Sequence, residues 1–288
     1  MSIVQEQQFD HSNHWSAEML NVGRIKQLVS DIMPSEQVRA GRTMGLHVIE
    51  GSDVHADIGR YVEWQVFENA FGNDIDTMRS EYEPYDSASV FLTLVDYEKQ
   101  QPAAVIRLIK PEGPKGLKSL NDLISPTLEQ PDGTQIQNPW YEAGDTLESR
   151  LNEVGNDGSK IVDIGTMAVM PEYRSAHAQA GASAVLYSSC ARWSFEQDYP
   201  FWVTIIDERA LRMIQSWGEP FENFDHADYA SYLDSSSSIP MHLDLYKCVP
   251  KIRAYDEVNG SDIFGLYTQG SGLKEQYVLP DFTLPDIG

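Results

Sequence analysis

Apolar positions recur about every three to four residues in several stretches of the chain, which is the pattern of amphipathic helices. The first stretch is 16–34, and the second is 53–72, closed by Gly72. Two more, 181–197 and 209–217, follow later in the chain. The pattern predicts a helix at each of these places.

Shorter runs rich in β-branched and aromatic residues are bounded by turn residues, which is typical of β-strands. Residues 43–51 form one such run, and 89–111 contains two runs joined by a polar turn, the signature of a hairpin. Further strands are expected at 160–169, at 201–206 and within 235–248. Because strands and helices alternate, we predict an α/β protein with a mixed central sheet flanked by helices.

Two parts of the chain fall outside this pattern. Residues 111–152 are rich in proline, glycine and acidic residues, so we expect a surface insertion there. The last residues carry prolines in an extended context and are expected to lie along the surface or to be loose. The chain thus divides into an N-terminal helical extension at 1–42, a central domain at 43–245 and a C-terminal extension at 246–288.

The composition is that of an acidic globular protein. Of the 288 residues, 41% are hydrophobic, which is enough for a substantial core. The 44 acidic and 21 basic residues give a formal charge of -23, and a surface so negative repels nucleic acid. Because no apolar run has the length of a membrane span and the first residues lack the features of a signal peptide, a cytoplasmic location is expected.

Residues that commonly bind metals show no ligand pattern in the sequence. Cys190 and Cys248 form neither a disulfide framework nor a zinc motif, and the histidines are scattered. We therefore expect no metal site.

The joint between the strand at 160–169 and the helix at 181–197 carries the first functional signal. Pro171 ends the strand, Arg174 supplies a cation, and small residues lead into the helix. The N-terminus of a helix carries partial positive charge, and small side chains let an anion approach the backbone. The joint therefore suits a diphosphate, although close packing of an alanine-rich helix produces the same pattern.

This joint resembles the acetyl-CoA-binding motif of the GNAT superfamily of N-acyltransferases, in which a strand ending in V-x-P-x-x-R leads into a glycine-rich turn. Residues 167–174, MAVMPEYR, match the motif through Arg174. Gln179 and Gly181 are the nearest equivalents of the family's turn residues, within a longer RSAHAQAGASA. The resemblance implies acyl-CoA as co-substrate and a central strand that is splayed from its neighbour beside Ala168.

A second resemblance is to the acyl-homoserine-lactone synthases and the long-chain N-acyl amino acid synthases. In that branch, E-x-D-x-x-D precedes a hairpin whose second strand carries an arginine. Glu83 and Asp86 stand where the two aspartates would be, and Arg107 where the arginine would be. The branch's strand motif E-x-x-R-F-x-V reads DIGTMAV here, with Asp163 for the glutamate and Thr166 for the arginine. The second replacement counts against homoserine lactone synthesis.

Together the two resemblances imply a set of site residues. The acceptor amine must lose a proton to react, so carboxylates are the candidate bases. The candidate catalytic residues are Glu83, Asp86 and Asp163, the candidate acceptor-binding residues are Arg107 and Thr166, and the candidate acyl-CoA-binding residues are Met167, Ala168, Val169, Arg174, Gln179, Gly181 and Ala182. The tyrosine that many GNAT enzymes use as general acid is replaced by Ile214.

Several interpretations stay open from the sequence. The leading function is acyl transfer from acyl-CoA, or less readily from an acyl carrier protein, to the amine of a small metabolite or amino acid. A non-catalytic GNAT-fold binding module would explain the missing tyrosine. A transferase dependent on aminoacyl-tRNA would need a basic groove, for which Lys110, Lys115 and Lys118 form the local cluster. Arg107 either orients the acceptor or forms a salt bridge with Glu83 or Asp86.

Overall fold

The computed structural model describes residues 14–18, 20–33, 42–130, 133–141, 145–174, 181–215, 221–274 and 276–284. The strands of its main sheet are β1 (Met44–Glu50), β2 (Ser89–Asp96), β3 (Gln101–Ile109), β6 (Ile161–Val169), β7 (Phe201–Asp207), β8 (Glu222–Asn223), β9 (Ala230–Tyr232), β10 (Ser235–Asp244) and β11 (Tyr277–Val278). Their order is β11-β1-β2-β3-β6-β7-β10-β8, with β9 paired to β10. A separate hairpin joins β4 (Thr127–Glu129) to β5 (Gln135–Gln137).

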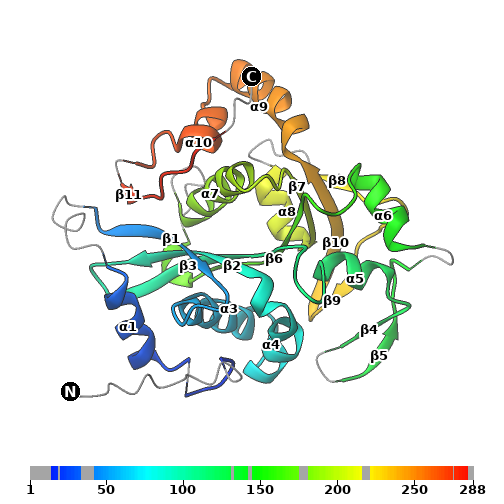
Figure 1. The fold of residues 1–288 in the computed structure, drawn as a ribbon, viewed down its shortest axis with the longest axis horizontal. Coiled ribbons are helices and arrows are strands. Elements are labelled where there is room, and N and C mark those ends of the chain that lie inside the picture. The colour runs from blue at the N-terminus through cyan, green and yellow to red at the C-terminus, as the bar shows by residue number, and fades with distance from the viewer. Residues whose placement is uncertain are drawn as a thin grey trace, which may run out of the picture.

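Helices cover both faces of this sheet (Figure 1). They are α1 (Val22–Asp31), α3 (Ala56–Phe71), α4 (Ile75–Tyr82), α5 (Lys118–Ile124), α6 (Leu147–Val154), α7 (Ala182–Glu196), α8 (Glu208–Gln215), α9 (Leu245–Asn259) and α10 (Ile263–Gln269), with the 3-10 turns η2 (Glu83–Ala88) and η3 (Pro171–Tyr173). On one face α3 packs on β2, β3 and β6, and α1 packs on α3. On the other face α7 packs on the same strands, and α10 packs on α7. The prediction of a mixed sheet flanked by helices is confirmed.

The segment 111–152 is not the surface insertion that the sequence predicts. Leu120 and Leu123 of α5 and the indole of Trp140 are buried in the same core cluster as β3 and β6. Helix α5 lies against β6 and β7. Because polar residues separate these buried apolar side chains, the sequence did not indicate that the segment covers part of the sheet.

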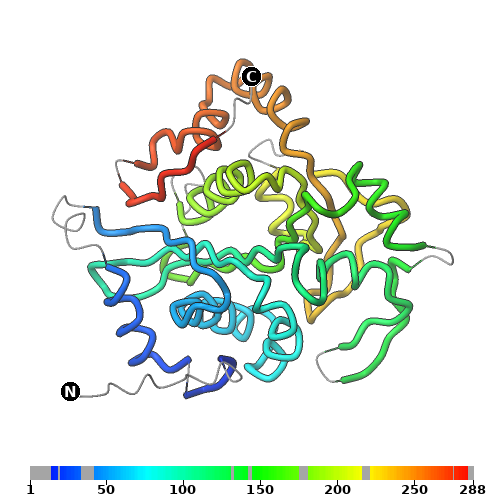
Figure 2. Tube along the Cα trace, in the orientation of Figure 1, coloured from blue at the N-terminus to red at the C-terminus, as the bar shows by residue number. Residues whose placement is uncertain are grey.

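The C-terminal extension also contributes to the sheet. Strand β11 pairs in parallel with β1, Met44 opposite Tyr277, and the Tyr277 side chain is buried. The red end of the described chain lies beside β1 (Figure 2). The helices α9 and α10, which the sequence pattern did not predict, connect the last central strand to this edge. Pro250 lies inside α9 and interrupts its helical pattern.

Two classes of feature are absent from the described ranges. No helix there combines the length and apolar character needed to cross a membrane. No three or more His, Cys, Asp or Glu residues there are arranged to hold a metal ion.

The close approach of α3 to the sheet depends on Gly59. A Cβ at this position would lie 2.5 Å from Cδ1 of Phe91 and 3.1 Å from Cγ2 of Val105. We expect Gly59→Ala to lower the free energy of unfolding by about 1–3 kcal/mol, because the helix must shift away from a close-packed core. The measurement is urea-induced unfolding.

The matched control is Gly23→Ala in the exposed part of α1, where the added Cβ would meet Asn21 Oδ1 at 3.3 Å. There the gain in helix propensity, up to about 1 kcal/mol, should keep stability unchanged or raise it. Equal stabilities for the two variants would contradict the proposed packing constraint.

Candidate active site

Strands β6 and β7 are paired only near their beginnings. The parallel ladder joins 161–163 to 201–203, and the hydroxyl of Thr204 then donates to the carbonyl oxygen of Ile164 at 2.9 Å. Beyond this point β6 continues to Val169 and β7 to Asp207 without pairing to each other. This unpaired stretch, here called the β6–β7 seam, lies beside Ala168, as the resemblance predicts.

The backbone of β6 presents alternate residues to the seam. Met170 donates its N–H to the carbonyl oxygen of Ala103 at 2.9 Å, so its backbone groups face β3. Because successive residues of an antiparallel ladder face opposite sides, Ala168 also faces β3, whereas Met167 and Val169 direct N–H and C=O into the seam. The Ala168 side chain is buried among the residues under α3.

At the end of β6 the chain turns through η3 and reaches Arg174. The exposed Arg174 side chain folds back, and its Nε donates to the carbonyl oxygen of Val169 at 3.0 Å. The hydroxyl of Tyr173 donates to Asp96 Oδ2 at 2.8 Å and accepts from Gln101 Nε2 at 2.8 Å. The β2–β3 hairpin therefore anchors η3 and fixes a cation at the end of the seam.

Helix α7 begins on the far side of this turn. Gly181 is its N-cap and has no side chain to cap the helix, and the first turn at Ala182 carries the partial positive charge of a helix N-terminus. The predicted residue Gln179 lies outside the described residues, as does His177.

Arg107, on β3, is buried and paired with two carboxylates. Its Nε and Nη2 donate to the Glu63 carboxylate at 2.9 and 2.6 Å, and its Nη1 donates to Asp86 Oδ1 at 2.7 Å. The hydroxyl of Thr166 on β6 donates to Glu63 Oε1. The chain's own carboxylates thus neutralise Arg107, and the salt bridge with Asp86 is confirmed.

The network extends from Asp86 towards the N-terminus. Asp86 Oδ2 accepts from Arg60 Nε and from the Trp15 indole, each at 3.1 Å. Arg60 also donates to Asp57 at 2.6 Å, and Arg24 pairs with the same aspartate at 2.7 Å. The charges of Arg24, Arg60 and Arg107 therefore balance those of Asp57, Glu63 and Asp86.

Each ion in this network stabilises the charged form of its partners. Burial alone would lower the pKa of Arg107, but Glu63 and Asp86 outweigh it and raise that pKa above its ordinary value. Burial acts to raise the pKa of Asp57, whereas the hydrogen bond from His14 and the charge of the nearby Arg60 bring it below its ordinary value. Removing one member of such a network leaves a buried charge, at a cost of about 3–5 kcal/mol.

Asp163 lies on β6 at the closed end of the seam. It is opposite Ile109 of β3, so its side chain points to the same face of the sheet as that of Arg107. The carboxylate is buried and accepts from N and Oγ of Ser119 at 2.5 and 2.8 Å. Burial raises its pKa from 3.8 to about 6, although the hydrogen bonds from Ser119 oppose this shift. A carboxyl group in this range can accept a proton at neutral pH.

The structure separates the three candidate carboxylates. Asp86 and Asp163 lie on the face of the sheet that α3 covers, whereas Glu83 is exposed on η2. Glu63, which the sequence reasoning missed, occupies the position beside Arg107 where Glu83 was an expected partner. Ile214, at the position of the family's tyrosine, is buried in the core.

One signal could have revealed the missed residues. Asp57, Arg60 and Glu63 recur every third position along α3. Residues three apart lie on one side of a helix. A row of charged residues on one side of a helix is usually exposed to solvent. Here the signal that it is buried is its partner Arg107, an arginine within an apolar strand.

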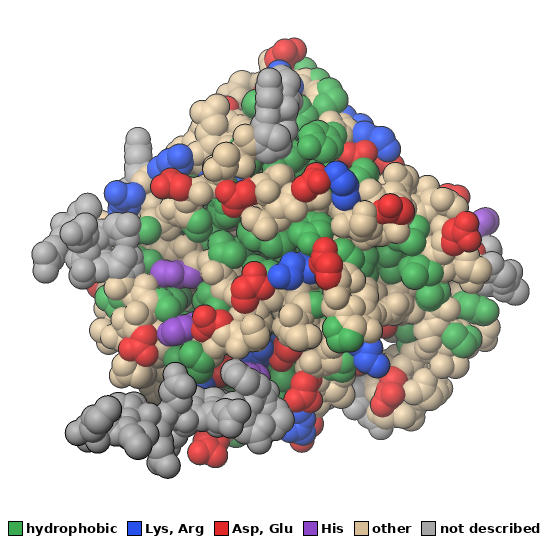
Figure 3. Space-filling view, viewed as in Figure 1, with side chains coloured by type: hydrophobic (Ala, Val, Ile, Leu, Met, Phe, Trp, Pro, Cys, Tyr) green, Lys and Arg blue, Asp and Glu red, His purple; other side chains and the backbone are tan. Residues whose placement is uncertain are grey.

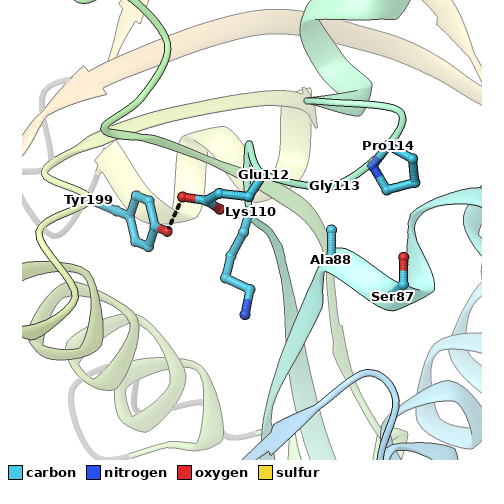
Figure 4. A pocket seen from close by; sticks show the side chains of 7 residues that line it. All are labelled: Ser87, Ala88, Lys110, Glu112, Gly113, Pro114 and Tyr199. Carbon is cyan, nitrogen blue, oxygen red and sulfur yellow. Dashed lines mark hydrogen bonds between the residues drawn. The ribbon is translucent and has the colours of Figure 1, made fainter.

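A cavity of about 360 Å³ lies at the other end of the sheet and is lined in part by Lys110, Glu112 and Tyr199 (Figure 4). The Tyr199 hydroxyl donates to Glu112 Oε1 at 2.6 Å. These residues follow the end of β3 or precede β7, whereas the unpaired part of the seam runs to the opposite ends of β6 and β7. The cavity is therefore separate from the seam.

Comparison with known proteins finds similarity to solved structures and none to a family model or a curated sequence. Among solved structures, it is similar to FeeM, an N-acyl amino acid synthase from uncultured soil microbes, with TM-score 0.52, 12% identity, and coverage of 74% of this chain and 96% of that one.

Two further solved structures resemble it less closely. A putative N-acetyltransferase from Lactobacillus plantarum has TM-score 0.43 and 13% identity, over 70% of this chain and 99% of that one. BjaI, a CoA-dependent acyl-homoserine lactone synthase, has TM-score 0.41 and 13% identity, over 85% and 96%. The likeness to FeeM confirms the predicted fold, a GNAT-like mixed sheet flanked by helices.

Proposed function

We propose that the protein is an N-acyltransferase that moves an acyl group from acyl-CoA to the amine of a small molecule. The observation that carries this proposal is the unpaired β6–β7 seam, into which Met167 and Val169 direct their backbone groups. A thin pantetheine arm could form the hydrogen bonds that β7 does not make there. The N-terminus of α7 and the Arg174 guanidinium would hold its diphosphate. A carrier protein would bring a larger acidic surface to a chain of charge -23, so acyl-CoA is favoured.

The reaction transfers the acyl group from the thioester sulfur to the amine nitrogen. The amine nitrogen attacks the thioester carbon, the N–C bond forms and the C–S bond breaks. The base takes the proton lost by the amine, and the sulfur leaves as a thiolate that is protonated by solvent. An N–H group in the seam stabilises the charge that develops on the carbonyl oxygen, a contribution of about 3 kcal/mol. We assign the proton-accepting role to Asp163, because its pKa of about 6 leaves it ionised and still basic at neutral pH.

Arg107, Asp86 and Thr166 act in this proposal by positioning. Thr166 donates to Glu63, and Arg107 joins Glu63 to Asp86, so the network ties β6 to α3 and η2. It holds β6 from one face while the seam stays unpaired along its edge. Glu83 lies on the surface of η2 and has no role in this scheme.

Two alternatives predict different measurements. A non-catalytic module, which the burial of Ile214 favours, would bind acyl-CoA and release no thiol with any amine. A function dependent on aminoacyl-tRNA is disfavoured because Lys118 of the local basic cluster is buried and paired with Glu81 and Asp122. On the face seen in Figure 3, lysine and arginine side chains lie singly among acidic ones.

Substitution of Arg174 tests the donor site. Arg174→Ala should weaken acyl-CoA binding about tenfold, because one charge-assisted contact to the diphosphate is lost. Isothermal titration measures this change. The matched control is Arg253→Ala, an exposed arginine on α9, which should leave the affinity unchanged. An acyl-pantetheine, which lacks the nucleotide, should bind both variants and the native protein equally. No binding of acyl-CoA to the native chain would reject the proposal.

The pH dependence of the reaction tests the base. For the native protein, kcat/KM for thiol release should rise as pH increases through about 6, because Asp163 must be ionised to accept a proton. Asp163→Asn should lower kcat/KM about 10²–10⁴-fold and abolish this limb of the profile. Ser119→Ala removes a hydrogen bond that holds the pKa down, so it should move the limb to higher pH. An unmoved limb in Ser119→Ala would argue that another group titrates.

The stability of the fold checks the same pKa independently of activity. Because folding raises the Asp163 pKa from 3.8 to about 6, the folded state binds the extra proton, and stability from this group falls as pH rises through that window. The loss amounts to about 3 kcal/mol at most. The native protein should therefore lose stability relative to Asp163→Asn between pH 4 and 7 in urea titrations. A constant difference across this range would contradict the raised pKa.

A further inference from the structure

The cavity of about 360 Å³ at the far end of the sheet has no part in the proposed transfer reaction. Its volume lies within the range of small-molecule sites in proteins, about 300–1,000 Å³. Glu112 and Ser87, which line it, are exposed to solvent, and Lys110 and Tyr199 are partly exposed. A small molecule can therefore reach the charged and polar groups of this cavity from outside.

Close packing holds the walls of the cavity in place. A Cβ at Gly113 would lie 2.4 Å from the Cβ of Ala88, so the loop after β3 contacts the end of η2 with no room for a side chain. The backbone N–H of Lys110 donates to the carbonyl oxygen of Ala88 at 3.0 Å. The two segments that form the cavity are thus bonded to each other, and the cavity is present before a ligand enters.

Glu112 presents a positioned carboxylate to this cavity. The Tyr199 hydroxyl donates to Glu112 Oε1 at 2.6 Å, and the Tyr199 ring stacks on the buried Trp193 with centroids 5.8 Å apart. Burial and the hydrogen bond to Glu112 raise the pKa of Tyr199, so its hydroxyl keeps its proton at neutral pH. Among the described residues no other group donates to the Glu112 carboxylate, so Oε2 can accept hydrogen bonds from a ligand.

Lys110 supplies the opposite charge but does not pair with Glu112. Its ammonium lies 2.9 Å from Oε2 of Glu50, which leaves two of its three N–H groups for other acceptors. Figure 4 shows the Lys110 side chain directed away from the Tyr199–Glu112 pair. An ammonium and a carboxylate that line one cavity without contacting each other leave space between them for a ligand that carries the complementary pair of charges.

We infer that this cavity binds a small amino acid as a zwitterion, with its carboxylate at Lys110 and its ammonium at Glu112. The inference does not depend on the proposed transferase function, because the cavity is separate from the seam. A ligand with a carboxylate alone would be repelled by Glu112 and Glu50, and one with an ammonium alone would leave Lys110 without a further partner. A zwitterion has no net charge, so the charge of -23 on the chain does not repel it at long range. Ala88 and Pro114 offer apolar contacts to its carbon chain.

The test compares five-carbon ligands that differ in their charged groups. Isothermal titration at neutral pH, without acyl-CoA, measures the affinities of 2-aminopentanoate, 5-aminopentanoate, pentylamine and pentanoate. We expect at least one of the two amino acids to bind about tenfold or more tightly than both pentylamine and pentanoate. Binding of neither amino acid, or affinities no higher than those of the ligands with one charge, would overturn the inference. Because the measurement needs no acyl transfer, failure of the transferase proposal would leave its outcome unaffected.

Variants locate the bound amino acid. Lys110→Met should lower its affinity to about that of pentylamine, and Glu112→Gln, which keeps a hydrogen-bond acceptor, to about that of pentanoate. Lys115→Met and Glu68→Gln replace exposed residues outside the cavity and are the matched controls, with affinity unchanged. Arg174→Ala should also leave the affinity unchanged. Full affinity in both cavity variants, or a loss in Arg174→Ala, would place the amino acid elsewhere and overturn the inference.

Discussion

A positive charge in the middle of a sheet governs much of this structure. Arg107 has no exposed surface, so its guanidinium must find anions within the protein. Glu63 comes from α3 and Asp86 from η2, and Trp15 of the N-terminal segment binds the second oxygen of Asp86. Satisfying one buried side chain therefore fixes three separate segments on the same face. The aromatic rings of Phe91 and Tyr82, at 4.5 and 4.9 Å from the guanidinium carbon, complete the enclosure.

The need to pair the buried Arg107 also explains how β6 can remain unpaired with β7 along part of one edge. A strand that leaves one partner loses hydrogen bonds and packing along that side. On its other edge β6 keeps its ladder with β3 up to Val169, and beneath it Thr166 is bonded to Glu63. The register shift between Arg107 and Leu108 places Gly165 at the irregularity, where a bulge increases the local twist of the strand. The seam is thus a consequence of a strand held firmly from one edge and one face.

The sequence patterns predicted the local features of this fold but not its long-range contacts. The hairpin at 89–111 and the strand-to-helix joint before Gly181 were predictable, because alternation, proline and small residues act within a few positions. The partner of Arg107 was not, since Glu63 lies 44 positions away in the sequence and no local pattern encodes that contact. The insertion at 111–152 was misinterpreted because its buried leucines are separated by polar turns. For Asp163 the residue type was a candidate from the motif, but the burial that raises its pKa emerges only when α5 covers it.

The arginine network is electrically neutral, so the whole formal charge of -23 falls on the rest of the chain. Dissolved ions act differently on the charges of the buried arginine network and on those of the rest of the chain. Repulsion among solvated carboxylates is screened over about 10 Å at 0.1 M salt, whereas ion pairs shielded from solvent hardly respond. Raising the ionic strength would thus weaken the repulsion among surface carboxylates and leave the buried arginine network almost unchanged. The folded protein should therefore be more stable at high salt concentration than at low salt concentration.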